Sequence, residues 1–196
     1  MVITQALNAT SAQINLLDSH SRPTETDVNV VFYDRFSGVI RYNMIHTLNN
    51  KGNPDTLSLD HMSTYDVVAQ TIPPVRFDSL KLVSGRHNTI GIDAPQGYLF
   101  VRTSRGKAYE QEKILVKKAG EHLTINIQQV GHQGKYLVGN YDLEIPIYPL
   151  MKINDVEILQ SYTTTVEIPA PGYVTFNTGQ PGAGALYQLT ATGEQQ

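Results

Sequence analysis

The fold is decided by a stretch that occurs twice. Residues 65–98 read YDVVAQTIPPVRFDSLKLVSGRHNTIGIDAPQGY, and a reworded copy, YDLEIPIYPLMKINDVEILQSYTTTVEIPAPGY, follows at residues 141–173. The two copies stay in register until one extra residue, Gln96, interrupts the first copy near its end. Identical or similar residues recur at Pro73 and Pro149, Thr89 and Thr165, Ile92 and Ile168, and Ala94-Pro95 and Ala170-Pro171. A repeat of this length indicates an array of similar modules rather than one large fold.

The repeat divides the chain into three parts. We predict a first module over residues 1–94 and a second over residues 95–170. Residues 171–196 are either the start of a third repeat or a C-terminal hairpin packed on the second module, because GYVTFNT at residues 172–178 matches GYLFVRT at residues 97–103. Two strands alone cannot close a sandwich, so these C-terminal strands are also candidates for self-association.

The hydrophobic pattern outside the repeat is that of β-strands. Apolar and polar residues alternate over residues 12–17, 28–33 and 123–128, and turn-forming segments rich in Pro, Gly, Asn and Asp separate such runs. A helix competes at residues 108–119, but Ile114-Leu115-Val116 favours a strand there. We therefore predict an all-β protein of tandem antiparallel β-sandwich modules, transthyretin-like or immunoglobulin-like, with no substantial helix.

Composition excludes several classes of function. The 196 residues include 15 basic and 18 acidic side chains, a formal charge of −3, so no basic surplus attracts nucleic acid. The chain has no cysteine, which rules out disulfides and thiolate chemistry. No apolar run reaches the roughly 20 residues that span a bilayer, and the first residues do not have the pattern of a signal peptide.

Short phrases in both copies resemble a known class of module. Residues 63–67, STYDV, and 138–143, VGNYDL, are each followed by a strand, a gap and then TIGI or TTTVEI. These phrases resemble transthyretin-like and carboxypeptidase-regulatory-like β-sandwich modules. Together with APQGYLFV and PAPGYVTF they are similar to the small β repeats beside von Willebrand factor A domains in Bacteroidota-type envelope proteins. Module one has Thr64 where the family has a glycine before the tyrosine.

The resemblance implies a role rather than a reaction. It implies a non-catalytic structural or protein-interaction region of a larger extracytoplasmic or cell-surface bacterial protein. The implied partner is another protein or the remaining domains of a longer chain. The implied location is the periplasm or the cell surface.

Searches for catalytic and metal-binding patterns identify no site. A nucleophile elbow, a P-loop and a dinucleotide-binding glycine pattern are missing, and the six histidines never fall at the spacing of a helical zinc site. Asp66 and Asp142 recur at matched positions, which favours a turn or strand-end role over catalysis. We predict no enzyme activity, no cofactor and no metal, and leave open a calcium ion in the loop at residues 49–55.

Tyrosines are the remaining candidates for binding. Tyr65, Tyr98, Tyr141 and Tyr173 occupy repeated positions and are predicted to pack in the core with their hydroxyls on backbone groups, as in a tyrosine corner. Tyr148 and Tyr162 have no tyrosine counterpart in the first module, and Tyr187 lies in the C-terminal segment. These three residues form the candidate binding surface, and a carbohydrate-binding module that uses them is the alternative function.

Overall fold

The computed structural model describes residues 10–106, 109–172, 175, 177, 179–182, 184, 188–190 and 193–195. These residues form strands and no helix, so the predicted all-β class is confirmed. No helix long and apolar enough to cross a membrane occurs among them. The segment in which helix and strand competed forms a strand, β9, at Lys113–Lys118.

Fourteen of the strands form two sets of seven. Module 1 contains β1 (Ser11–Leu17), β2 (Val28–Asp34), β3 (Ile40–His46), β4 (Thr56–Ser58), β5 (Thr64–Ala69), β6 (Val75–Lys81) and β7 (His87–Asp93). Module 2 contains β8 (Gln96–Thr103), β9, β10 (Thr124–Gln129), β11 (Gln133–Leu137), β12 (Gly139–Ile145), β13 (Met151–Ile158) and β14 (Thr163–Ile168). A short antiparallel hairpin of β15 (Gln188–Thr190) and β16 (Gly193–Gln195) follows.

The two modules have the same topology. Module 1 has a four-stranded sheet in the order β3-β2-β5-β6 and a three-stranded sheet in the order β4-β1-β7. Module 2 repeats this arrangement seven strands later, with β10-β9-β12-β13 and β11-β8-β14. Each module buries its own core between its two sheets, one drawn from residues 12–94 and the other from residues 99–168.

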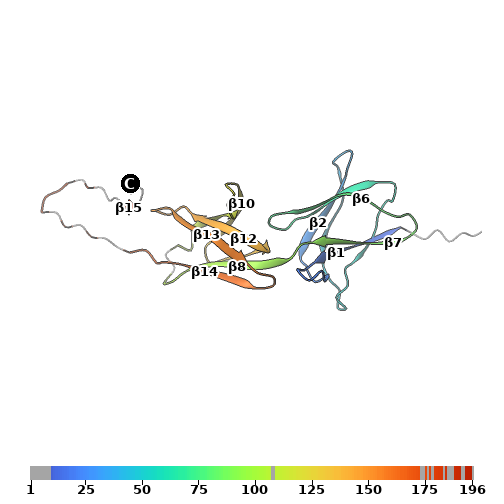
Figure 1. Cartoon of the computed structure of the whole chain (residues 1–196), viewed down its shortest axis with the longest axis horizontal. Coiled ribbons are helices and arrows are strands. Elements are labelled where there is room, and N and C mark those ends of the chain that lie inside the picture. The colour runs from blue at the N-terminus through green and yellow to red at the C-terminus, as the bar shows by residue number, and fades with distance from the viewer. Residues whose placement is uncertain are drawn as a thin grey trace, which may run out of the picture.

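One feature of the sheets was not predicted. The four-stranded sheets are antiparallel, but the first and last strands of each module, β1 with β7 and β8 with β14, pair in parallel. They run in the same direction because the chain enters each module at one end and leaves it at the other. This path allows successive modules to follow one another end to end, as modules 1 and 2 do in Figure 1.

The repeated tyrosines hold equivalent corners in the two modules. Tyr65 and Tyr141 are buried, and their hydroxyls donate hydrogen bonds to the backbone carbonyls of Asp60 (2.9 Å) and Leu137 (2.7 Å). The predicted tyrosine corner is therefore confirmed at these two positions. Tyr98 is only half-buried, and Tyr173 lies outside the described residues.

The repeated aspartates have a structural role that is the same in both modules. Oδ1 of Asp66 accepts the backbone N–H of Ser79, and Oδ1 of Asp142 accepts that of Asp155, each at 2.9 Å. Ser79 and Asp155 both have left-handed backbone angles, with φ of 62° and 58°, beside a register shift in the pairing with β5 or β12. Both aspartates therefore serve local structure, but not at a turn or strand end as predicted, because they lie within β5 and β12 and each secures an irregularity in the adjacent edge strand.

Candidate functional site: the joint between the modules

The most elaborate polar arrangement outside the two cores lies where the modules meet, and we call this contact zone the joint. Module 1 contributes the β1–β2 loop (residues 18–27), the β5–β6 loop (residues 70–74) and the exit at residues 94–95. Module 2 contributes the start of β8, the end of β11 and the β13–β14 turn at residues 159–162. In Figure 1 the chain passes through the joint as a nearly continuous line from β7 into β8.

A buried carboxylate of module 1 lies at the centre of the joint. The Glu25 side chain, in a residue only 6 % exposed, accepts hydrogen bonds from the backbone N–H of Gln96 (3.2 Å) and from the Gln96 side chain (3.1 Å). The side-chain amide of Gln160 donates a third hydrogen bond to the same carboxylate. Gln96 itself is 3 % exposed. A buried carboxylate is stable only with such partners, and here all three donors come from module 2.

Further polar contacts surround Glu25. The ammonium of Lys135 lies 3.9 Å from the Glu25 carboxylate and donates a hydrogen bond to the carbonyl of Thr26 at 2.8 Å. The side-chain carbonyl of Gln160 accepts the backbone N–H of Ser19 at 3.0 Å. Lys135 and Gln160 of module 2 therefore each contact the β1–β2 loop at two residues.

Backbone bonds and an exchange of apolar side chains complete the joint. The N–H of Leu137 donates to the carbonyl of Ile72, and that of Val138 donates to the carbonyl of Pro95, both at 2.8 Å. Ile72 of module 1 packs against the core of module 2, while Leu137 of module 2 packs against the core of module 1. Each module thus contributes one side chain to the other's hydrophobic interior.

The β1–β2 loop is ordered by its own hydrogen bonds before it meets module 2. Asp18 accepts the backbone N–H groups of His20 and Arg22, the hydroxyl of Thr24 and the guanidinium of Arg22. Burial raises the pKa of Asp18, but these hydrogen bonds outweigh it and hold the pKa well below its ordinary value. A loop held in this way presents Glu25 with little further loss of conformational entropy.

His46 lies beneath the same loop. The residue is fully buried, and its backbone carbonyl accepts the N–H of Asp27 at 2.9 Å. Neither ring nitrogen has a hydrogen-bond partner among the described residues. Burial lowers the pKa of His46, and the nearby Glu25 backbone and Asp55 carboxylate only partly oppose this effect. The imidazole ring of His46 is therefore uncharged at neutral pH and packs inside module 1 at the end that faces the joint.

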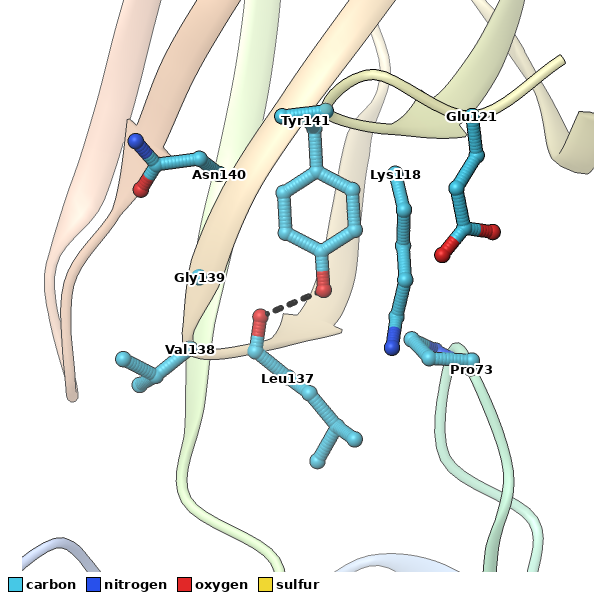
Figure 2. Close-up of a pocket in the computed structure, with 9 residues that line it drawn as sticks. Pro73, Lys118, Glu121, Leu137, Val138, Gly139, Asn140 and Tyr141 are labelled. Atoms are coloured by element: carbon cyan, nitrogen blue, oxygen red, sulfur yellow. Dashed lines mark hydrogen bonds between the residues drawn. The ribbon is translucent and has the colours of Figure 1, made fainter.

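Beside the joint lies a small cavity of about 240 Å³. Figure 2 shows its lining: the ring of Tyr141 with its hydroxyl toward the Leu137 carbonyl, the side chains of Lys118 and Glu121, and Pro73 reaching in from module 1. Burial raises the pKa of Tyr141 to about 12, so its hydroxyl stays protonated and serves as a hydrogen-bond donor. The lining offers no nucleophile with an adjacent base, and the cavity belongs to the packing of the joint.

The predicted binding tyrosines do not form one surface. Tyr148 is 78 % exposed and Tyr162 is 63 % exposed. They flank the two ends of β13, so the length of an eight-residue strand, about 25 Å, separates them. Tyr162 lies in the turn on the joint side of module 2, and Tyr148 lies at the opposite end of the module. Tyr187 lies outside the described residues.

The other candidate positions are used by local structure. Within the described residues no group of three or more His, Asp or Glu side chains is arranged to hold a metal ion. In the loop at residues 49–55, the side chain of Asn49 accepts the backbone N–H groups of Lys51 (2.9 Å) and Asn53 (3.1 Å). Asn49 therefore stabilises its own turn, as asparagines commonly do.

Sequence reasoning missed the residues of the joint. Glu25 falls in a stretch read only as a turn, and Lys135 and Gln160 have no distinctive neighbours in the sequence. One signal was present, because Gln96 is the single residue that interrupts the repeat. The sequence therefore revealed Gln96 as an extra residue at the module boundary. It did not reveal that the Gln96 amide binds the Glu25 carboxylate.

Comparisons with known proteins identify no family. No family model and no curated protein matches the sequence. Among solved structures, "The Bacillus anthracis TIE protein" is 12 % identical with a TM-score of 0.31, over 81 % of this chain and 34 % of that one. A leucine-rich repeat protein from Bacteroides thetaiotaomicron is 13 % identical with a TM-score of 0.27, over 82 % of this chain and 26 % of that one. This chain thus spans about a third of the first protein and about a quarter of the second.

Proposed function

We propose that this chain is a non-catalytic structural region that acts as a stiff spacer within a larger extracytoplasmic protein and presents other parts of that protein to a partner. The extracytoplasmic location in this proposal rests only on the resemblance of the repeated phrases to envelope-protein modules. The stiffness rests on the joint.

The observation that carries the proposal is the burial of Glu25 against donors from the other module. A flexible linker would leave such a carboxylate in water, where it needs no partners. The junction is also short and buried, since β7 ends at Asp93, β8 begins at Gln96, and Ala94 between them lies in the core of module 1. Bending at this junction would break hydrogen bonds to Glu25 and withdraw Ile72 and Leu137 from the opposite cores.

The test measures whether the two modules move as one body. Nuclear magnetic relaxation of the backbone amides in the full chain is expected to give modules 1 and 2 one common, elongated tumbling. Glu25→Ala is expected to separate their correlation times, while Glu157→Ala, which removes an exposed carboxylate from β13, leaves them together. Independent tumbling of the modules in the unmodified chain would overturn the proposal.

A further inference from the structure

We propose that the end of module 2 remote from the joint is a second docking face, and that its occupant is a further seven-stranded module entered from residue 172. This inference rests on the proposed spacer function and adds a partner to it. We call this surface the far face. It is formed by residues 104–106 and 109–112 of the β8–β9 loop, the β12–β13 loop at residues 146–150 and the chain exit at residues 170–171.

The first argument is that the equivalent end of module 1 is already covered. Because the strand order is the same in both modules, the far face contains the same loops that module 1 places in the joint. In module 1 those loops bury Glu25 and Ile72 against module 2. The far face offers the same two backbone acceptors, the carbonyls of Tyr148 and Pro171, at the positions of Ile72 and Pro95.

The second argument is the chemistry of the exposed side chains. Tyr148 occupies the repeat position of Ile72, the side chain that module 1 inserts into the next core, yet it is largely exposed. Leu150, two residues later, is also exposed. Large apolar side chains on a loop whose counterpart in module 1 is covered by module 2 indicate a surface that another module covers.

The far face differs from the joint in the side chains of the loop that precedes the second strand of each module. Phe32 pairs with Val67 in module 1 as Val116 pairs with Leu143 in module 2. Tyr109 precedes Val116 by as many residues as Glu25 precedes Phe32, in a loop that is shorter in module 2. Tyr109 packs partly against the core of module 2. The described part of this loop thus carries an aromatic ring at a place where module 1 has a carboxylate, and the Gln96 that binds the carboxylate has no counterpart before Gly172. Because the far face lacks both the carboxylate and the glutamine that binds it, its contact with a third module is expected to be more apolar than the joint.

The third argument comes from the sequence after the exit. Gly97 has no room for a side chain, because a Cβ there would lie 2.0 Å from the carbonyl oxygen of Leu159. The third copy of the phrase keeps this glycine as Gly172, followed by Tyr173. Further on, β15 and β16 pair as an antiparallel hairpin. These residues have the pattern expected of the opening strands of a third module.

A second copy of this chain is a poorer occupant. The carbonyl that accepts the corner tyrosine belongs to Leu137 in module 2 but to Asp60 in module 1. Asp60 is charged, and its carboxylate accepts the N–H of Met62 (2.9 Å) and the hydroxyl of Ser63 (3.0 Å) within its own loop. The free end of module 1 therefore presents a charged residue, engaged within its own loop, at the position where module 2 presents Leu137.

The experiment extends the chain with a module of known docking geometry. Residues 1–171 are kept unchanged and are followed by a second copy of residues 97–171, so that Pro171 precedes the same glycine and tyrosine as in the joint. Backbone relaxation with the copies labelled separately is expected to show all three modules tumbling together. Tyr148→Asp in the first copy of module 2 is expected to release only the third module, lowering its correlation time toward that of a free module.

The matched control is Ile127→Asp in the same copy, which changes an exposed apolar side chain within β10, outside both the joint and the far face, and is expected to release nothing. Tyr148→Ser gives a milder variant, should the aspartate disturb folding. If the third module tumbles freely in the unmodified three-module chain while modules 1 and 2 stay coupled, the docking face is overturned and the spacer proposal stands. If modules 1 and 2 also separate, both proposals fail.

Discussion

Single side chains fix the corners on which the modules are built, and the tyrosine hydroxyls can be tested individually. Tyr141→Phe removes the hydrogen bond to the Leu137 carbonyl and keeps the buried ring. We expect a loss of about 1 kcal/mol in the free energy of unfolding, because a buried hydrogen bond contributes a net amount of this order. Chemical denaturation of the full chain measures it.

Tyr148→Phe is the control for this prediction. Its side chain is exposed, and the structure gives its hydroxyl no partner among the described residues, so its removal is expected to leave stability unchanged. Tyr65→Phe is expected to behave like Tyr141→Phe, since its hydroxyl is bonded in the same way to Asp60. A neutral Tyr141→Phe together with a destabilising Tyr148→Phe would contradict the assigned roles.

His46 makes the stability of module 1 depend on pH. Burial lowers its pKa in the folded chain below the ordinary value of 6.5, so the unfolded chain binds more protons between the two values. The contribution of neutral His46 is therefore fully present above pH 6.5 and is lost as the pH falls through 6.5 toward the folded-state pKa. Thermal melting between pH 8 and pH 5 is expected to show this loss.

His46→Leu is expected to remove that dependence. The leucine has a similar volume and leaves no unpaired ring nitrogen in the core, so stability at pH 7 is expected to rise by about 1 kcal/mol. The variant and the unmodified chain are expected to diverge further as the pH falls below 6.5. An unchanged slope of stability against pH in the variant would show that other groups cause it.

Edge strands depend on the repeated aspartates, because each carboxylate holds a left-handed residue beside a bulge. The backbone N–H groups of Asp155 and Gly120 hold the pKa of Asp142 below its ordinary value of 3.8. A depressed pKa means that the carboxylate stabilises the fold above pH 3.8 and loses this effect as the pH falls through the folded-state value. Asp142→Ala is expected to lower the melting temperature of the chain at pH 7, by several degrees.

Asp142→Asn separates geometry from charge. Its side-chain carbonyl can still accept the N–H of Asp155, so a smaller decrease than in Asp142→Ala is expected. Asp155 has a left-handed backbone angle at the same bulge, and glycine adopts such an angle without steric cost. The backbone conformation is therefore expected to cause no loss of stability in Asp155→Gly. Equal melting temperatures for Asp142→Ala and the unmodified chain would contradict the role assigned to the carboxylate.

The sequence was sufficient for the strands and corners but not for their assembly. Alternation of apolar residues predicts β1, β2 and β10, and matched Tyr-Asp pairs predict the corners, because these features depend on contacts within a few residues. The parallel pairing of β1 with β7 depends on which strands meet across a sheet, and alternation along one strand carries no information about its neighbour.

The joint was harder to predict than the fold for a physical reason. Glutamate, glutamine and lysine in loops are usually exposed, so nothing in their local sequence distinguishes Glu25 or Gln160 from ordinary surface residues. Their role arises only when module 2 covers the β1–β2 loop. The exposed tyrosines were easier to single out, yet sequence could not tell that Tyr148 and Tyr162 lie at opposite ends of the same strand.

For the molecule as a whole, the exchange of Ile72 and Leu137 between the cores couples the folding of the two modules. Each side chain packs on the opposite core only when both modules are folded, so unfolding one module removes packing from the other. Calorimetry of the full chain is expected to show one cooperative transition for modules 1 and 2. Leu137→Ala is expected to cost about 2 kcal/mol, near the low end for such truncations because the side chain is only half-buried.

The double variant Ile72→Ala with Leu137→Ala removes both exchanged side chains and leaves each module's own core in place. It is expected to split the single transition into two, because the polar contacts around Glu25 and the two backbone hydrogen bonds of the joint remain, whereas the apolar packing between the cores is lost. Leu123→Ala, which truncates an exposed leucine of module 2, is expected to preserve the single transition and its midpoint. Two separate transitions in the unmodified chain would mean that the joint orients the modules without coupling their stability.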